Sequence, residues 1–203
     1  MKLYDYERAP NARRVRVYLA EKGLTVPVET VDLGTMQHKS EAYTDINPMR
    51  RVPALVLDDG TVIAESMAIC RYFEALNPSP PLFGTDATSI ALVEMWNRFA
   101  ELYLFFPVAQ VFRHLHPGMA AMEVPQVAAW GEANKPRVAE FLPVLDRQLA
   151  AGPFVCGAQY SVADITALVG IDFMKPARLT VPPEYGNILR WRALVSGRPS
   201  ARA

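Results

Sequence analysis

The chain has 203 residues, of which 51% are hydrophobic and 21% are charged, a composition typical of a globular protein and not of a disordered one. Its 21 basic and 21 acidic residues cancel and are spread evenly, so the sequence lacks the basic footprint of a nucleic-acid-binding protein. The longest apolar stretch, near 102–109, is too short for a membrane span, which needs about 20 residues.

The N-terminus and the cysteines both indicate a cytoplasmic protein. Asp5 and Glu7 stand where a signal peptide would need an apolar core. Cys70 and Cys156 cannot form a disulfide framework, and we interpret both as small buried residues and not as nucleophiles. Two scattered cysteines and three histidines lack the spacing of metal ligands, so we expect no metal site.

The first 77 residues predict strands and helices in the order βαβ-ββα, with one further short helix in the middle. A strand–helix–strand start favours parallel strands joined by a right-handed crossover. In the first helix we expect the apolar side chains inward and three arginines outward, namely Arg13, Arg14 and Arg16. The expected elements lie at 2–6, 10–22, 26–30, 40–46, 52–57, 61–64 and 66–76.

A proline-rich segment separates this part from the rest of the chain. Three prolines in four positions of Asn77-Pro78-Ser79-Pro80-Pro81 favour an extended spacer. Beyond it the strand signals vanish. We therefore predict an α/β domain at 1–77, a linker at 78–86 and an all-helical domain at 87–203.

The second domain predicts four helical stretches. Pro107 is expected to kink the first, and Pro136 and Pro143 to interrupt or bend the second. Ser161 and Asp164 match a capping box at the start of the third, so we give them a structural role and not a catalytic one. The stretches lie at 86–114, 123–150, from 161 onward, and 184–195.

Several short motifs follow one another along the chain. They are Ala9-Pro10-Asn11-Ala12-Arg13-Arg14-Val15, Asn47-Pro48, Arg51-Val52-Pro53-Ala54-Leu55, Glu65-Ser66, Phe154-Val155-Cys156-Gly157, Ser161-Val162-Ala163-Asp164, and Trp191 with Arg198-Pro199-Ser200. Each is weak alone, but their order and spacing resemble those of the cytosolic glutathione S-transferases. The resemblance covers essentially the whole chain and implies a thioredoxin-like α/β domain followed by an all-α domain.

The resemblance implies a glutathione site in the first domain. A cis bond between Val52 and Pro53, as in the family, would turn the Val52 backbone outward to pair with the cysteinyl part of glutathione. The helix that starts at Ser66 would attract the γ-glutamyl carboxylate, and Glu65 would face the ammonium group. The plain alternatives are an ordinary strand start at Val52-Pro53 and an ordinary helix cap at Glu65-Ser66.

Basic residues are the candidates for the glycine carboxylate of glutathione. In plant-type members a His-Lys pair and the residue before Val-Pro have this role, which here points to His38, Lys39 and Arg51. The alternative is a solvated charge cluster, which we prefer for Arg50. The family more often has glycine at the Arg50 position, so the loop shape is open to question.

The group that would activate the glutathione thiol is not at the usual place. The family commonly uses Ser, Tyr or Cys near the start of the first helix, and here that position holds Ala9. Tyr4 and Tyr6 flank the place of the catalytic tyrosine of other classes, which itself holds Asp5. The chain thus resembles bacterial and fungal members that lack the usual residue.

Relatives without that residue suggest other catalytic candidates. Some fungal transferases use a water held by a histidine and a serine of the helical domain, which points to His114 or His116. The plain alternative for both is a cation at a helix C-terminus. Some bacterial disulfide-bond reductases use the Asn of a Pro-Asn pair, which matches Asn11. Tyr6 is the remaining candidate.

The resemblance also implies an apolar pocket for the second substrate, lined from the end of the long helix and the next turn. Aromatic stripes at helical spacing are more often core, so only some members of this stretch are expected to face the pocket. The candidates are Phe105, Phe106, Phe112, Leu115, Met119 and Met122.

The leading functional hypothesis is a glutathione transferase of detoxification type, which conjugates its co-substrate glutathione to small hydrophobic electrophiles. One alternative is a glutathione-dependent disulfide reductase or peroxidase, which Asn11 favours slightly. The other is a non-catalytic binding or interaction module, which Ala9 favours. An intact Glu65-Ser66 pair speaks against that module, because a partner-binding protein has no need of a tripeptide site.

The resemblance further implies a homodimer, and no nucleic-acid or membrane partner. The family pairs the first domain of one copy with the helical domain of the other. We expect four residues to supply that face, namely Met67, Arg71, Met95 and Phe99.

Overall fold

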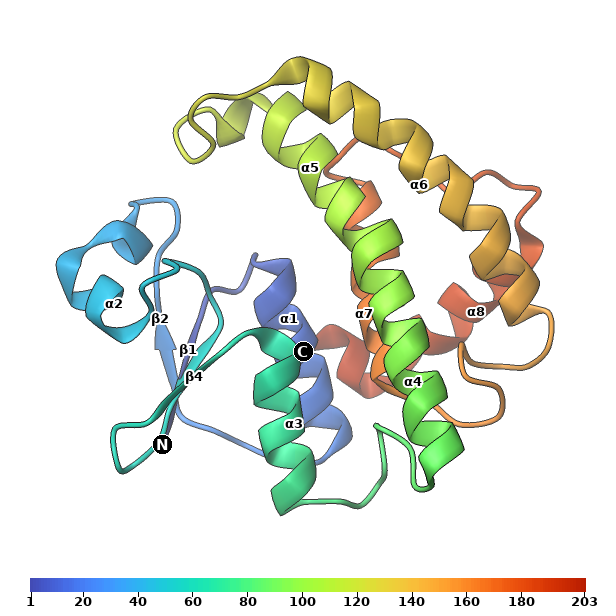
Figure 1. Ribbon diagram of the computed structural model, residues 1–203, viewed down its shortest axis with the longest axis horizontal. Helices are drawn as coiled ribbons and strands as arrows, with labels where there is room; N and C mark the ends of the chain where they lie inside the picture. Colours follow the sequence, from blue (N-terminus) through green and yellow to red (C-terminus); the bar gives the residue numbers. More distant parts are fainter. The chain divides into compact units, whose positions relative to one another are not determined.

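A computed structural model describes residues 1–203 and divides them into two compact units (Figure 1). The first contains residues 1–81 together with 202–203, and the second contains residues 82–201. The junction between Pro81 and Leu82 lies at the end of the proline-rich segment. The first unit is α/β and the second is all-helical, which confirms the predicted fold class.

A four-stranded mixed sheet forms the centre of the first unit. Its strands are β1 (Lys2–Asp5), β2 (Val28–Thr30), β3 (Ala54–Val56) and β4 (Val62–Ala64), in the order β2-β1-β3-β4. β1 is parallel to β2 and antiparallel to β3, and β3 is antiparallel to β4. The strands β1 and β4 therefore run in the same direction.

The helices of the first unit are α1 (Pro10–Glu21), α2 (Glu41–Ile46) and α3 (Ser66–Leu76). α1 and α3 pack side by side and begin at the same end (Figure 1). Pro10 occupies the first turn of α1, where its missing N–H costs nothing, and Gly23 with φ = +63° follows its end. The buried face of α3 includes Ile69, Cys70 and Phe73.

One arginine of α1 is buried, against the expectation that its arginines lie outside, and so is Lys22, the residue after the helix. Arg14 is only 1% exposed, whereas Arg13 and Arg16 are partly exposed as expected. The Lys22 ammonium, fully shielded from solvent, lies 2.6 Å from Glu74 and donates to the carbonyls of Asn77 (2.8 Å) and Pro80 (2.5 Å). The start of the linker is therefore tied down and is not a free spacer.

The second unit begins with a long helical run. α4 (Ala87–Phe99) leads into a π-helical turn (Ala100–Phe105) and then α5 (Phe106–Leu115). The wider turn ends just before Pro107, which has no N–H to donate, so the predicted kink takes the form of a π-helical segment. Asp86 caps α4 through the N–H groups of Thr88 and Ser89.

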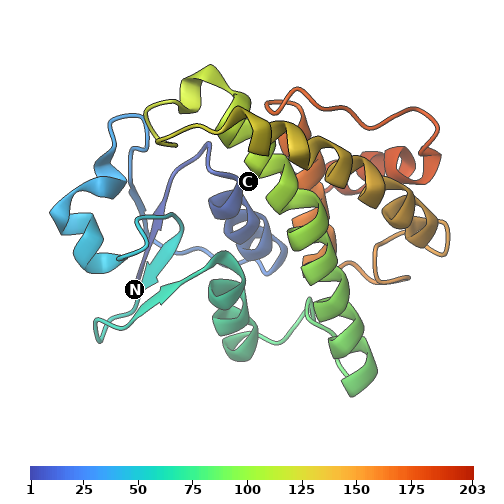
Figure 2. The same cartoon turned by 45° about the horizontal axis from the view of Figure 1, so that its top comes forward.

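Three further helices complete the second unit: α6 (Ala128–Leu149), α7 (Val162–Met174) and α8 (Gly186–Ser196). α6 packs along α5 (Figure 2). Residues 162–171 of α7 are all buried, as expected for an apolar helix with neighbours on every side. Of all the helices, none combines the length and apolar character needed to cross a membrane.

The second predicted helix starts five residues later than expected, at Ala128 and not at 123. Two local features explain the difference. Pro125 disfavours helical backbone at Val124. The N–H of Val127 is bound by the His114 ring at 3.0 Å, which holds residue 127 outside the helix.

The predicted capping box of α7 is confirmed and does more than cap. Asp164 Oδ2 accepts from the Ser161 N–H at 3.0 Å, and Oδ1 accepts from the Val155 N–H at 2.9 Å and from Trp191 Nε1 at 2.8 Å. Asp164 and Trp191 are both 0% exposed. This carboxylate therefore joins the start of α7 to the preceding loop and to α8.

Candidate functional site

The sheet register brings the predicted glutathione residues to one edge of the first unit. Tyr4 pairs with Ala54, and Ala54 pairs with Ala64, so these three residues form one row across the sheet. β4 ends at this row, β1 ends one residue beyond it, and β3 begins there. The segments that follow or precede the row are Asp5-Tyr6, Val52-Pro53 and Glu65-Ser66. We call this end of the sheet, at which β1 and β4 finish, the carboxyl edge.

The backbone of Val52 is held in a defined direction at the carboxyl edge. The Arg51 carbonyl accepts hydrogen bonds from the Tyr43 hydroxyl at 2.6 Å and from Asn47 Nδ2 at 2.8 Å. Burial raises the pKa of Tyr43 to about 12, so its hydroxyl remains a donor. In a trans peptide the N–H opposes the carbonyl, so the Val52 N–H points away from these two side chains.

The peptide after Val52 leaves its backbone open. The Val52–Pro53 bond is cis, and Val52 itself is 7% exposed. Neither the N–H nor the carbonyl of Val52 has a hydrogen-bond partner in the chain. An extended peptide ligand can therefore pair with both groups, as a strand pairs with its neighbour.

The start of α3 is also open. No side chain caps this helix, and the first residue, Ser66, is buried. The N–H groups of the first turn and the positive end of the helix dipole favour a bound carboxylate. Glu65, just before it, is exposed and has φ = +72°, a backbone region that non-glycine residues rarely occupy. Such conformations concentrate at ligand sites.

The start of α1 is the second open helix start at this edge. Ala9 stands at the cap position and supplies no side-chain acceptor. Asn11 Oδ1 accepts from Arg14 Nη1 at 3.2 Å, which leaves the amide Nδ2 of Asn11 without a partner in the chain. A buried arginine thus fixes the asparagine so that its N–H₂ group can donate to a ligand.

Asp5, at the place of the catalytic tyrosine of other classes, has a structural role. Arg16 Nη1 lies 2.8 Å from both of its carboxylate oxygens, and Arg16 Nη2 donates to the Glu7 carbonyl at 2.7 Å. This pairing pins the loop between β1 and α1. The Tyr6 ring packs beside Val52 in the cluster formed by Ala9, Ala12, Val31, Tyr43 and Val52.

The basic candidates lie on two loops between β2 and β3. His38 is 4% exposed within a 3₁₀ turn (Gln37–Lys39), and Lys39 and Arg51 are exposed. Arg50 has φ = +54°, which is the region that glycine occupies most easily. The loop therefore takes a glycine-like shape although it has no glycine there.

The two histidine candidates belong to the second unit and share one arrangement. His114 Nδ1 accepts from the Val127 N–H at 3.0 Å, and His116 Nδ1 accepts from the Gly118 N–H at 3.1 Å. Each ring therefore carries its proton on Nε2 in the neutral form. Both fold the loop between α5 and α6 back on itself, in addition to any role that Nε2 has.

The predicted second-substrate residues fall into three environments. Phe105 is buried and contacts Phe173, with ring centroids 6.0 Å apart, whereas Phe106 is 47% exposed. Met119 is partly exposed in the 3₁₀ turn Pro117–Met119. Phe112 and Leu115 line a cavity within the second unit.

Sequence reasoning missed three residues that shape the carboxyl edge: Arg14, Tyr43 and Asn47. Asn47 belonged to a noted motif, Asn47-Pro48, but the motif alone does not show that its amide holds the Arg51 carbonyl. We expected Arg14 to be exposed to solvent because it is charged, although it lies on the buried side of α1. A position four residues before the buried Tyr18 was the available signal.

Comparisons with known proteins agree with this geometry. Models of the N-terminal and C-terminal domains of glutathione S-transferases match residues 9–76 and 128–199. Glutathione S-transferase 2 of Saccharomyces cerevisiae is 35% identical over 205 residues, which cover 100% of this chain and 88% of the relative. A maleylacetoacetate isomerase of Pseudomonas aeruginosa is 43% identical over 89 residues, 42% of each chain.

A solved structure extends the match to the whole fold. A glutathione S-transferase domain-containing protein of Marinobacter aquaeolei is 37% identical, with a TM-score of 0.95 over 98% of this chain and 99% of that one. The family models, the full-length relative and the solved structure therefore all indicate the same family. The chain belongs to the glutathione S-transferase family, a family of transferases with glutathione as co-substrate.

Proposed function

We propose that this protein conjugates the glutathione thiolate to small hydrophobic electrophiles, in a cytoplasmic detoxification role. The observation that carries the proposal is the convergence of three open backbone sites at the carboxyl edge: Val52, the start of α3 and the start of α1. Glutathione offers an extended peptide, two carboxylates, one ammonium and one thiol. The three sites and the charges beside them match these groups.

Each part of glutathione has a partner in this proposal. The Val52 N–H and carbonyl pair with the cysteinyl residue beside cis-Pro53. The Ser66 hydroxyl and the N–H groups of α3 bind the γ-glutamyl carboxylate, and Glu65 binds the ammonium. His38, Lys39 and Arg51 bind the glycine carboxylate.

The thiol then lies beside the start of α1. Asn11 Nδ2 and the free N–H groups after Pro10 donate to the thiolate, and the dipole of α1 favours its charge. A water held by His114 or His116 is a further donor, and Tyr6 is the outside candidate. The thiol proton goes to solvent, the sulfur bonds to the electrophilic carbon, and the leaving group departs with its electron pair.

Calorimetry tests the glutathione site. We expect Glu65→Ala and Ser66→Ala each to weaken glutathione binding about ten- to a hundredfold, since a lost hydrogen bond to a charged group costs roughly 1.5–3 kcal/mol. Glu41→Ala is the matched control, because Glu41 is an exposed acid in the first turn of α2. Wild-type affinity in both test variants would refute the assignment.

The alternatives predict other activities. A glutathione-dependent disulfide reductase or peroxidase, which the open Asn11 amide would also suit, would turn over a disulfide or peroxide substrate faster than an aryl halide. A non-catalytic module would turn over neither, and would lack glutathione affinity if it serves only a protein partner. Parallel assays on the three substrates, with a glutathione-affinity pull-down, separate these functions.

We further propose a two-fold homodimer. Met67 and Arg71 on α3, and Met95 and Phe99 on α4, are all at least partly exposed and could supply its face. A near-neutral chain offers little net repulsion between copies. Light scattering at micromolar concentration should give twice the monomer mass of 22.6 kDa, and the monomer mass itself would contradict the proposal.

A further inference from the structure

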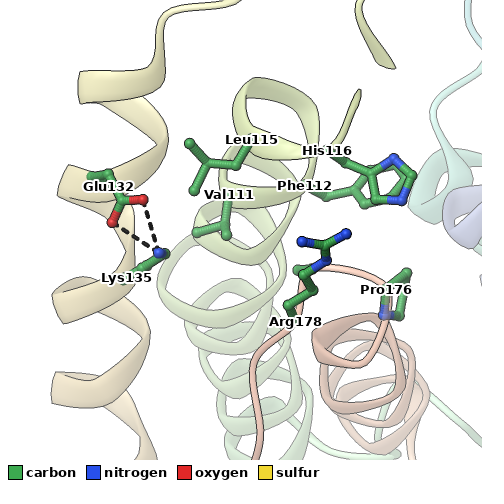
Figure 3. A pocket seen from close by; sticks show the side chains of 9 residues that line it. Val111, Phe112, Leu115, His116, Glu132, Lys135, Pro176 and Arg178 are labelled. Carbon is green, nitrogen blue, oxygen red and sulfur yellow. Dashed lines mark hydrogen bonds and ion pairs between the residues drawn. The ribbon is translucent and has the colours of Figure 1, made fainter. Parts of the chain in front are cut away.

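The second unit contains a cavity of about 300 Å³ between α5, the first half of α6 and the turn after α7 (Figure 3). This volume is at the lower end of the range for ligand pockets, which suits a molecule of one or two rings. One part of its wall is apolar, through Val111, Phe112, Leu115 and Pro176, and the other part carries the polar side chains of His116, Glu132, Lys135 and Arg178.

Two neighbouring rings, tilted against each other, line one side of the cavity. The centroids of Phe112 and His116 lie 4.8 Å apart at an interplanar angle of 34°. Phe173 supports Phe112 from behind, at 5.0 Å, and the Gly118 N–H holds the His116 ring. The two rings are therefore held in place, and an aromatic ligand can pack against them.

One of the charged side chains around the cavity has no partner of opposite charge. Lys135 and Glu132 lie one turn apart on α6 and pair with each other at 2.8–2.9 Å. The Arg178 guanidinium points toward α5 (Figure 3) and has no hydrogen bond or ion pair within the chain. Because Lys135 and Glu132 offset each other, the Arg178 guanidinium is the cation of this cavity that has no acidic partner.

Arg178 is held in a specific backbone position. Its φ is +58°, and the turn that carries it is closed by the bonds Arg178 N–H to the Lys175 carbonyl (3.0 Å) and Leu179 N–H to the Met174 carbonyl (2.8 Å). Non-glycine residues rarely occupy this region, and such conformations concentrate at ligand clamps. The turn thus presents the guanidinium at the cavity.

We propose that this cavity binds a planar aromatic ligand that carries a carboxylate, with its ring against Phe112 and His116 and its carboxylate on Arg178. A guanidinium and a carboxylate match as a bidentate pair, which gives both affinity and orientation. Neutral aromatic ligands would gain the stacking but lose the ion pair.

Binding of two matched probes to the full chain without glutathione tests this proposal. We expect 4-chloro-3-nitrobenzoate to bind about ten- to a hundredfold more tightly than 4-chloro-3-nitrobenzamide, because it adds charge-assisted hydrogen bonds. Arg178→Met should abolish the preference and leave the benzamide unaffected. Arg147→Met, at an exposed arginine near the other end of α6, should leave both affinities unchanged. An equal affinity for both probes in the wild type, or an unchanged preference in Arg178→Met, would overturn the proposal.

A second measurement distinguishes a substrate from a non-substrate ligand. Both probes are aryl halides, so attack by the glutathione thiolate forms a carbon–sulfur bond and releases chloride. If the ligand is a substrate, Arg178→Met raises KM for the benzoate alone; if it is not, the benzoate binds with the same preference but is not turned over. The binding result does not depend on glutathione, so it stands or falls separately from the proposed transferase function.

Discussion

Two helix starts of the second unit, those of α4 and α7, differ from two of the first unit, those of α1 and α3, in how their free N–H groups are used. In the second unit, the Asp86 side chain caps α4 and the Ser161–Asp164 box caps α7. In the first unit, α1 and α3 begin at Ala9 and Glu65, with no side-chain cap at either. The orphan donors are thus satisfied by the chain itself at α4 and α7 and left open at α1 and α3; in addition, Ser40 caps α2 in the first unit, and α6 in the second has no side-chain cap.

This difference separates stability from binding. A capped start contributes to folding at all times, because its donors have partners within the chain. An open start keeps its donors and its dipole for a ligand, and the fold gives up the stability that a cap would supply. The open starts of α1 and α3 are therefore available to a ligand at the candidate site.

The largest effect should come from breaking the closed start of α7. Asp164→Ala leaves the buried donors of Val155, Ser161 and Trp191 without their acceptor, so we expect the free energy of unfolding to fall by about 3 kcal/mol or more. Urea unfolding measures the loss. Asp86→Ala, at the exposed cap of α4, should cost only about 1 kcal/mol. Equal small losses in both variants would show that burial of the cap adds nothing.

The same carboxyl group should give the stability a pH dependence. Burial raises the pKa of Asp164 to about 6, against hydrogen bonds that favour the carboxylate. The folded protein therefore binds this proton more tightly than the unfolded chain, and the contribution to stability is full below about pH 4 and falls as pH rises to about 6. Unfolding curves of Asp164→Ala should lack this decline.

A smaller effect should follow from removing a donor at the open start of α1. Asn11→Ala should raise the pKa of the bound glutathione thiol by about one unit, the equivalent of one modest hydrogen bond. Turnover should fall while glutathione affinity remains nearly unchanged. The ultraviolet absorbance of the bound thiolate, titrated against pH, measures the pKa directly.

Tyr6→Phe is the control for that titration. It removes the Tyr6 hydroxyl, which is the other side-chain group of the first unit that we consider as a donor to the glutathione thiolate. If Asn11→Ala leaves the titration unmoved and Tyr6→Phe abolishes it, the protein uses a tyrosine and our placement of the sulfur is wrong.

The smallest effect concerns the backbone at the open start of α3. Glycine accepts φ = +72° without steric cost, so Glu65→Gly should raise the free energy of unfolding by about 0.5–1 kcal/mol. The same variant should bind glutathione more weakly, because the acid that faces the ammonium is lost. A stabilised protein with weaker binding would show directly that the open start trades stability for a site. Unchanged stability would mean that Glu65 is not strained.

Much of the fold was predictable, because it depends on signals that are local in the sequence. The order of strands and helices, the capping box at Ser161 and the kink before Pro107 all follow from neighbouring residues. The burial of Arg14 and Lys22 was not predictable, because the environments of these two side chains depend on residues distant in the chain. The late start of α6 was not predictable either, since it requires the ring of His114 to reach Val127.

The candidate site was predictable in its residues but not in its construction. The motifs pointed to Val52, Glu65 and Ser66, and the register of the sheet places them at one edge. That Tyr43 and Asn47 fix the peptide before Val52 is a tertiary fact, which no single-sequence pattern records. The roles of these residues toward glutathione remain predictions for the experiments above.

The contacts of Lys22 have a consequence for dividing the chain. Its shielded ammonium depends on Glu74 and on the carbonyls of Asn77 and Pro80, which lie beyond the last residue of α3. A first unit cut at Leu76 would bury a positive charge with two of its three acceptors missing. Anyone who wishes to produce that unit alone should therefore retain the prolines and cut after Pro81, because the segment that looks most dispensable in the sequence neutralises the end of α1.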